Sequence, residues 1–369
     1  MNGEVAVETY RVGLVPGPTA VPPEVRACYA RDYGSSDLEP EFAALYRDTQ
    51  ALLGHMLRSA TPPLIMMGEA MVTLWGALRS CVAPGDRVLA VGTGLFGYGV
   101  AEMARACGAT VEIVGFEHEE IADPSRVEDA IRRVRPRMVT MIHCETPSGT
   151  LNPVREVGEA VRRVGDGALF YVDAVASAGG APLDVEQWGI DLCLVGTQKV
   201  LSCLPDLGIL TVSPRAWERA RQVGYTGYDA LLPFEQAAQT GYFPYTFSWP
   251  AVAALRVAVS RLLDEGVEAS IVRHARVAAL CRRRAAECGV ALFPRDERGS
   301  APTVTALRVP QRIGWPALDA ALRQRGVVVG GSYGPLAGHV LRIGHMGTQA
   351  DEALVAAGMD ALQEIVQAS

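Results

Sequence analysis

Short apolar runs alternate along the chain with segments whose apolar residues recur at helical spacing. Six of these runs have the length of a strand and are apolar almost throughout, at residues 87–91, 111–114, 138–142, 168–172, 192–195 and 207–212. Strands without polar alternation are typical of a sheet that is buried on both faces. The alternation with helical segments therefore predicts an α/β fold, with a parallel sheet between layers of helices.

Two amphipathic helices are expected outside these runs. Apolar positions from Phe42 to Met56 fall on one stripe of a helix, and Asp37 is placed to cap it. A second stripe covers residues 252–263 and ends at Gly266. Beyond that glycine the pattern predicts a smaller α+β domain, made of two helices, strands near 304–309 and 327–329, and a closing helix from Asp351.

The chain has 369 residues and a net charge of −7, from 34 basic and 41 acidic side chains. This length fits two domains, and the acidic balance makes nucleic acid and anionic membranes poor partners. The N-terminus lacks the basic start and apolar core of a secretory signal, and no apolar stretch is long enough to cross a bilayer. The eight cysteines are scattered, without the spacing of a metal site. We therefore expect reduced thiols, no metal and a cytoplasmic location.

Lysine is almost absent from the basic residues. Only Lys199 is a lysine, and the other 33 are arginine. A bias toward arginine in solvated positions gives no reason to keep one lysine, although chance could do so. Arginine stays protonated in proteins and forms no imine with a carbonyl, whereas lysine can lose its proton and form one. Lys199 is therefore a candidate for covalent chemistry.

Several polar side chains and one aromatic ring follow the ends of four predicted strands: Thr93, Phe96, Glu145, Thr146, Asp173, Gln198 and Lys199. Ligands of an open parallel sheet bind beyond the carboxyl ends of its strands, so we expect these residues to converge. Asp173 and Lys199 can then face each other across a ligand. Pyridoxal phosphate requires such a pair, since the amine forms an imine and the carboxylate keeps the pyridine nitrogen protonated. A buried ion pair without chemistry is the alternative.

Four longer motifs resemble the class V aminotransferases of PLP fold type I, the group that contains alanine–glyoxylate, serine–pyruvate and 2-aminoethylphosphonate transaminases. They are HCETPSGTLNP from His143, YVDAVASAGG from Tyr171, VGTQK ending at Lys199 and RIGHMG from Arg342. VPGPTAVPPEV near the start and APGDRVL from Ala83 also match, so the resemblance covers nearly the whole chain. It implies an N-terminal segment (1–20) packed on the small domain, a large domain (21–255) that binds pyridoxal 5′-phosphate, and a small C-terminal domain (256–369).

The resemblance also implies roles for matching residues. Lys199 would carry the internal aldimine and move a proton between substrate and cofactor, while Asp173 would pair with the pyridine nitrogen. Thr146 would approach the phenolic oxygen of the cofactor, and Phe96 would stack on its ring. Arg342 would bind the carboxylate of an amino-acid substrate, a contact that suits the planar guanidinium.

The phosphate of the cofactor would bind Gln198 and a loop formed by Gly68, Glu69 and Ala70. Thr246, with Tyr245 beside it, would reach the phosphate from the neighbouring subunit, so the resemblance implies a homodimer with its active site at the interface. The family usually has glycine and serine in that loop, and Glu69 would repel a phosphate unless its side chain is paired or points away. Two further departures are Phe243, where many relatives have tyrosine, and Ser35 with Ser36, where many have a His-Arg pair.

Three functions remain open from the sequence. The first is transfer of an amino group between a small amino acid and a 2-oxo acid or aldehyde. The second keeps the cofactor but catalyses β-elimination or decarboxylation of an amino acid in a natural-product pathway, since the bond held perpendicular to the ring is the one that breaks. The third is a binding or scaffold protein on a decayed transaminase fold, which the presence of Asp173, Gln198 and Lys199 disfavours.

Overall fold

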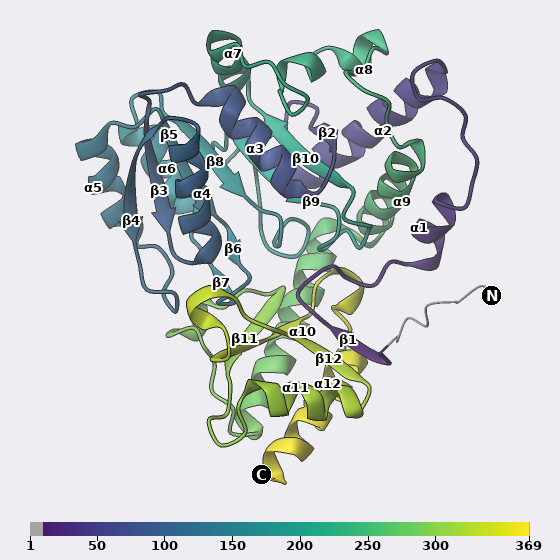
Figure 1. The fold of residues 1–369 in the computed structure, drawn as a ribbon, viewed down its shortest axis with the longest axis vertical. Coiled ribbons are helices and arrows are strands. Elements are labelled where there is room, and N and C mark those ends of the chain that lie inside the picture. Colours follow the sequence, from purple (N-terminus) through teal and green to yellow (C-terminus); the bar gives the residue numbers. More distant parts are fainter. Residues whose placement is uncertain (1–9, 369) are drawn as a thin grey trace, which may run out of the picture.

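The computed structural model describes residues 10–368, which form two sheets with their helices. Figure 1 shows the larger sheet in the upper part of the molecule and the smaller one below it. Residues 1–9 of the predicted N-terminal segment lie outside the described part. The boundaries of that segment and of the two predicted domains stay predictions.

The larger sheet has seven strands in the order β2-β10-β9-β8-β5-β3-β4. All six strands predicted in this region are confirmed. They are β3 (Arg87–Gly92), β4 (Thr110–Gly115), β5 (Met138–Ile142), β8 (Leu169–Asp173), β9 (Leu192–Gly196) and β10 (Leu207–Val212). The five strands from β4 to β9 are parallel, and β10 runs antiparallel to both of its neighbours. The seventh strand, β2 (Leu64–Met67), was not predicted; it is a run of four apolar residues between a proline pair and Gly68.

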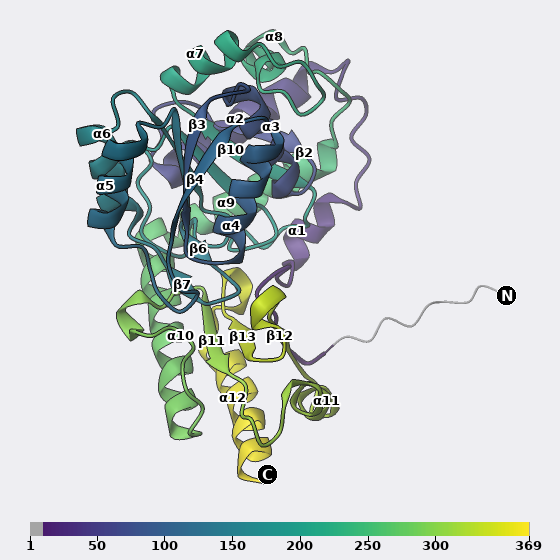
Figure 2. The ribbon, with the colours of Figure 1, turned by 60° about the vertical axis from the view of Figure 1, so that its left-hand side comes forward.

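Helices cover both faces of this sheet. Figure 2 shows α5 (Pro124–Val134) and α6 (Val154–Val164) on one side, and α3 (Ala70–Cys81) and α4 (Leu95–Ala106) on the other. The remaining helices of this region are α1 (Pro23–Cys28), α2 (Pro40–Leu57), α7 (Pro214–Val223), α8 (Ala237–Thr240) and α9 (Trp249–Glu265). The cap expected from Asp37 is wrong. Helix α2 begins at Pro40, and the Asp37 carboxylate instead accepts a hydrogen bond from Thr246 Oγ1 at 2.5 Å.

The smaller sheet has the order β1-β12-β13-β11 and packs with α10 (Val267–Glu287), α11 (Trp315–Gln324) and α12 (Glu352–Gln367). Its N-terminal strand β1 (Val12–Leu14) pairs in parallel with β12 (Val327–Gly331). Strand β11 (Val304–Arg308) was predicted, whereas β13 (Val340–Gly344) was not, because its short run contains a buried arginine. A short hairpin of β6 (Cys144–Glu145) and β7 (Thr150–Leu151) completes the strands of residues 10–368.

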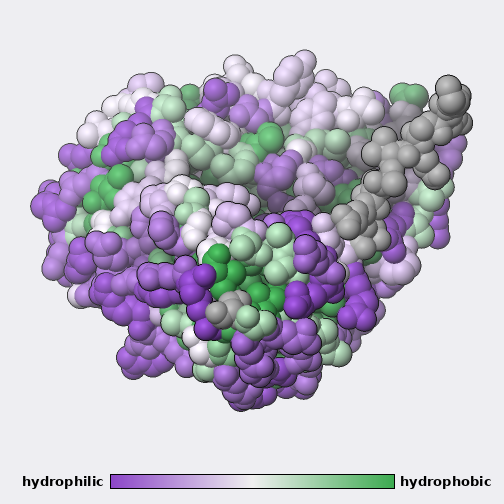
Figure 3. Space-filling view, turned by 60° about the horizontal axis from the view of Figure 1, so that its bottom comes forward, coloured by the Kyte–Doolittle hydropathy of each residue, from purple (hydrophilic) through white to green (hydrophobic). Residues whose placement is uncertain are grey.

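The lower surface is largely polar (Figure 3), and most of the cysteines are buried. Figure 3 looks onto the molecule from below and shows mostly hydrophilic residues in its lower part, with one group of hydrophobic residues near the lower centre and others scattered elsewhere. Within residues 10–368, every helix is too short or too polar to cross a membrane. All eight cysteines are unpaired, and seven of them are buried.

Candidate active site

A cavity of about 100 Å³ lies where β5, β8 and β9 end. Its walls bring together most of the predicted site residues, since it is lined by Glu69, Ala70, Met71, Phe96, Ile142, Cys144, Thr146, Asp173, Val175, Ala176, Gln198 and Lys199. The parallel strands deliver their terminal residues to one edge of the sheet, which is why segments far apart in the sequence meet here. Thr93, also expected there, is buried outside the lining and accepts a hydrogen bond from the Asn152 side chain.

The amine of Lys199 lies under the N-terminal segment. Its Nζ donates a hydrogen bond to the carbonyl oxygen of Pro16 at 2.8 Å. Gly17 has φ +88° and makes this approach possible, because a Cβ at this position would lie 2.5 Å from Nζ. Burial lowers the pKa of Lys199, and the positive charge of Arg342 lowers it further. The environment therefore makes it easier for the amine to lose its proton and become the form that attacks a carbonyl.

Asp173 is the last residue of β8, and its carboxylate faces the same cavity. Its Oδ1 accepts a hydrogen bond from the backbone nitrogen of Val175 at 2.9 Å. Burial raises the pKa of Asp173 to about 6, although this hydrogen bond and the charge of Lys199 act in the opposite direction. No ion pair joins Asp173 to Lys199 in the described structure. With a pKa of about 6 this carboxylate is mostly ionised at neutral pH, and no basic side chain of residues 10–368 forms an ion pair with it.

Phe96 is held on the cavity wall by a residue whose role the sequence did not reveal. The buried carboxylate of Glu145 accepts hydrogen bonds from the backbone nitrogens of Phe96 (3.2 Å) and Gly97 (2.7 Å), in the first turn of α4. Burial raises the pKa of Glu145 to about 7. Thr146, the next residue, is 4% exposed and lines the cavity. The signal in the sequence was a glutamate three residues after the apolar run 138–142, since a carboxylate that is buried beside such a strand needs a specific partner.

The opposite end of the cavity lies at the N-terminus of α3. Glu69 is the N-cap of this helix, and its Oε2 accepts a hydrogen bond from Met71 N at 2.8 Å. Its Oε1 accepts a second bond, from Nε2 of Gln198, at 2.6 Å. The backbone nitrogen of Gly68 already donates to the carbonyl oxygen of Asp206 at 2.8 Å. The Glu69 carboxylate thus occupies two donors, Met71 N and Gln198 Nε2, that could serve a phosphate at this helix end.

Arg342 lies on β13 of the smaller sheet and is only 3% exposed. Its Nε donates to the carbonyl oxygen of Gly331 at 2.7 Å, and its guanidinium carbon lies 4.7 Å from the centre of the Tyr333 ring. Burial lowers the pKa of Arg342. None of the ion pairs in the described structure involves Arg342, so this buried cation has no carboxylate of its own.

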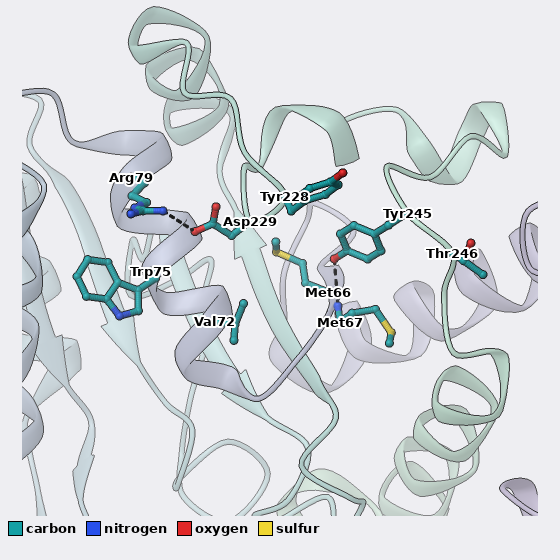
Figure 4. A pocket seen from close by; sticks show the side chains of 9 residues that line it. All are labelled: Met66, Met67, Val72, Trp75, Arg79, Tyr228, Asp229, Tyr245 and Thr246. Atoms are coloured by element: carbon teal, nitrogen blue, oxygen red, sulfur yellow. Dashed lines mark hydrogen bonds and ion pairs between the residues drawn. The ribbon is translucent and has the colours of Figure 1, made fainter.

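Tyr245 and Thr246 do not line the cavity around Lys199. Figure 4 shows them in a second, more open hollow beside α3, in which the hydroxyl of Tyr245 accepts a hydrogen bond from Met67 N at 3.2 Å. An ion pair between Arg79 and Asp229 closes the far side of this hollow. The full lining is Met66, Met67, Val72, Trp75, Arg79, Tyr228, Asp229, Tyr245 and Thr246.

The residues around the first cavity fit a pyridoxal ring but do not fit its phosphate. At the ring end, Asp173 offers an unpaired carboxylate to a protonated pyridine nitrogen, Lys199 offers a buried amine, and Phe96 offers an aromatic face. At the other end, Glu69 places a negative charge where the phosphate would bind. The chain therefore keeps the residues expected to act on the pyridoxal ring. The end of the cavity that would bind the phosphate, called the anchor below, is changed.

Comparison with known proteins places the chain among transaminases. The family model for aminotransferase class V matches residues 33–342. The pyridoxamine–pyruvate transaminase of Mesorhizobium japonicum is 32% identical over 95% of this chain and 90% of the relative. The (S)-ureidoglycine–glyoxylate transaminase of Bacillus subtilis is 31% identical over 91% of this chain and 86% of the relative. The crystal structure of pyridoxamine–pyruvate aminotransferase from Mesorhizobium loti has a TM-score of 0.94 at 30% identity, covering 98% of this chain and 93% of that chain.

Proposed function

Because the chain belongs to the class V aminotransferases, which are pyridoxal-phosphate-dependent enzymes of fold type I, we propose that the cavity around Lys199 and Asp173 is its transamination site. The predictions of family, fold and aminotransferase function are confirmed, and the predicted cofactor is that of the family. Both relatives described above are transaminases, and neither favours the alternative of a lyase or decarboxylase. The observation that carries the proposal is the buried Lys199 amine in one cavity with an unpaired Asp173 carboxylate.

A pyridoxal ring bound in this cavity supplies an electron sink for the carbanion that forms when an α-proton leaves. The chain's residues do the rest. Asp173 holds the proton on the pyridine nitrogen, and Phe96 fixes the plane of the ring. Lys199 Nζ is the base that takes the proton from the substrate carbon and returns it, and the lowering of its pKa by burial and by Arg342 favours that role.

Arg342 binds the carboxylate of the 2-oxo acid and of the amino acid formed from it. It is buried without an acidic partner, so a substrate carboxylate meets an unsatisfied cation. The relatives described above are named for different amino donors, pyridoxamine and ureidoglycine, but both are named for a small 2-oxo acid, pyruvate or glyoxylate. We assign an acceptor of that size to this chain.

The enzyme acts as a homodimer in which Thr246 and Tyr245 reach the site of the neighbouring subunit. Within one chain these residues line the second hollow and not the cavity of Lys199. Two side chains that line this hollow, Val72 (45%) and Tyr228 (83%), are exposed, and a second subunit would cover them. The expected cytoplasmic location stays a prediction.

The test is a half-reaction with the purified enzyme. The enzyme carrying a pyridoxamine-type vitamer is mixed with pyruvate or glyoxylate, and the conversion to the aldehyde form is followed by absorbance while the amino acid is measured by chromatography. We expect one amino acid formed for each aldehyde. Release of ammonia or carbon dioxide over repeated turnovers, without an acceptor, would contradict the assignment.

A further inference from the structure

We propose that the end of the cavity formed by Glu69 and Gln198 binds an uncharged hydroxymethyl group, and that pyridoxamine and pyridoxal, the vitamers without a phosphate, are substrates of this enzyme. The inference rests on the proposed transamination at Lys199. It concerns the other end of the same cavity, where the chain departs from its family.

The Glu69 carboxylate is built into the site and does not point away from it. Both of its oxygens accept hydrogen bonds, from Met71 N at 2.8 Å and from Gln198 Nε2 at 2.6 Å. The residue also lines the cavity. The N-terminus of α3 attracts one anion through its free backbone nitrogens and its dipole. Because Glu69 is that anion, a phosphate would have to displace it or lie against it.

Gln198 supplies an independent observation at the same end. The side chain is only 5% exposed, and its Oε1 is buried without a hydrogen-bond partner. The orientation of the amide follows from its neighbour, since an ionised carboxylate can only accept and Nε2 must therefore face Glu69. Gln198, which lines the cavity, thus carries an acceptor without a hydrogen-bond partner. A hydroxymethyl group can donate a hydrogen bond to such acceptors, whereas a phosphate dianion cannot.

The charges around the cavity point the same way. Among its lining residues Lys199 is the one basic side chain, and the amine is used at the ring end. Asp173 and Glu69 are both acidic, and Glu69 acts electrostatically on Asp173. A phosphate ester carries a charge of about −1.5 to −2 at neutral pH. Its entry next to Glu69 would place like charges together in a partly buried site, while an alcohol brings no charge.

The reaction balances without another reagent. The amine of pyridoxamine condenses with the carbonyl carbon of the 2-oxo acid and one water leaves. A proton then leaves C4′ of the vitamer and one is added to the α-carbon of the acid, so the C=N bond moves to C4′. One water hydrolyses that bond and releases pyridoxal and the amino acid. The vitamer loses two electrons and the 2-oxo acid gains them, and Lys199 carries the proton.

The first experiment compares affinities. The full-length protein, freed of vitamers by dialysis, is titrated with pyridoxal and with pyridoxal phosphate, and binding is followed by the absorbance of the imine and by equilibrium dialysis. We expect the Kd of pyridoxal to be at least about tenfold lower than that of pyridoxal phosphate. Tighter binding of pyridoxal phosphate would overturn the inference, and this comparison needs no variant.

A variant then tests Glu69 itself. Glu69→Gln keeps the length of the side chain and an acceptor for Met71 N but removes the charge. We expect its affinity for pyridoxal phosphate to rise about tenfold, with a much smaller change for pyridoxal. Asp123→Asn is the matched control, because Asp123 caps α5 through a bond to Ser125 N of 2.9 Å and does not line the cavity. An unchanged affinity of Glu69→Gln for pyridoxal phosphate would contradict the role of the charge.

Turnover gives a separate readout. With excess pyridoxamine and pyruvate or glyoxylate, the enzyme should release many equivalents of pyridoxal per Lys199, whereas a resident cofactor would stop at one. The two proposals fail in different ways. If no aldehyde forms an adduct with Lys199, the proposed function is wrong. If pyridoxal phosphate forms the adduct and binds more tightly than pyridoxal, the proposed function stands and this inference is wrong.

Discussion

The two ends of the cavity differ in what they keep from the family. At the ring end, Lys199, Asp173, Phe96 and Thr146 occupy positions that match the motifs of class V aminotransferases, and the structure brings them to one wall. At the other end, a helix N-terminus that suits a phosphate is capped by the carboxylate of Glu69. In the proposed site, the residues for the reaction come from the ends of β8 and β9, and the residue that takes the place of a phosphate ligand comes from the start of α3.

This separation explains how one end can change without the other. The ring end depends on the strand termini, whose positions follow from the buried sheet. The anchor depends on the side chain of Glu69, which caps the N-terminus of α3. Another capping residue at this position could keep the hydrogen bonding of the helix. If the proposal holds, a change from a bound cofactor to a free vitamer needs no change in the strands or helices of the fold.

The largest effect is expected from removal of the amine. Lys199→Ala should lower the transamination rate by at least about 10³-fold, because the chain has no second lysine to form the imine or move the proton. Lys199→Arg is the matched control, since it keeps the positive charge and should be equally inactive. Single-turnover rates from stopped-flow absorbance give the measurement, and a rate near that of the parent would remove Lys199 from the mechanism.

The next largest effect is a pH dependence of pyridoxal binding, caused by the protonation of Asp173. The pKa of Asp173 is raised to about 6 by burial, so its carboxylate is ionised above that pH and becomes neutral as the pH falls through it. We expect the affinity for pyridoxal to decrease between pH 7 and pH 5. Asp173→Asn should weaken binding about 10- to 100-fold at pH 7 and flatten this pH dependence. Titrations at several pH values check both, and an equally steep profile in the variant would contradict the assignment.

Arg342 tests the proposed binding of the 2-oxo acid. Arg342→Gln should raise the KM for pyruvate or glyoxylate about 10- to 100-fold, because a charge-assisted bond to the carboxylate is lost. The affinity for pyridoxal should change much less, since Arg342 does not line the cavity that holds the ring. Steady-state kinetics and vitamer titration on the same preparation separate the two. Equal losses in both would indicate a general disturbance of the site.

The smallest effect concerns stability. Glu69→Gln should change the free energy of unfolding by less than about 1 kcal/mol, because glutamine can still accept the bond from Met71 N. Denaturant unfolding checks this value, with Asp123→Asn as the comparison. A much larger loss would mean that Glu69 serves the fold of α3 and not the ligand.

The residues expected at the pyridoxal ring could be predicted from the sequence. The arrangement of Glu69 at the other end of the cavity could be predicted only in part. The apolar runs placed five of the parallel strands, and Asp173 and Lys199 follow two of them directly. Glu69 was recognised as a departure, but the direction of its side chain depends on Gln198, which is distant in sequence. Strand β13, which carries Arg342, and the role of Glu145 were missed for a similar reason. A buried charge breaks the apolar pattern, and its partners come from other elements.

The most direct test is competitive trapping on the single lysine. The protein is incubated with equal concentrations of pyridoxal and pyridoxal phosphate, reduced with borohydride, digested and mapped by mass spectrometry. We expect the peptide with Lys199 to carry mainly the adduct of pyridoxal, without a phosphate. A peptide that carries mainly the phosphorylated adduct, or no adduct at Lys199, would contradict the account.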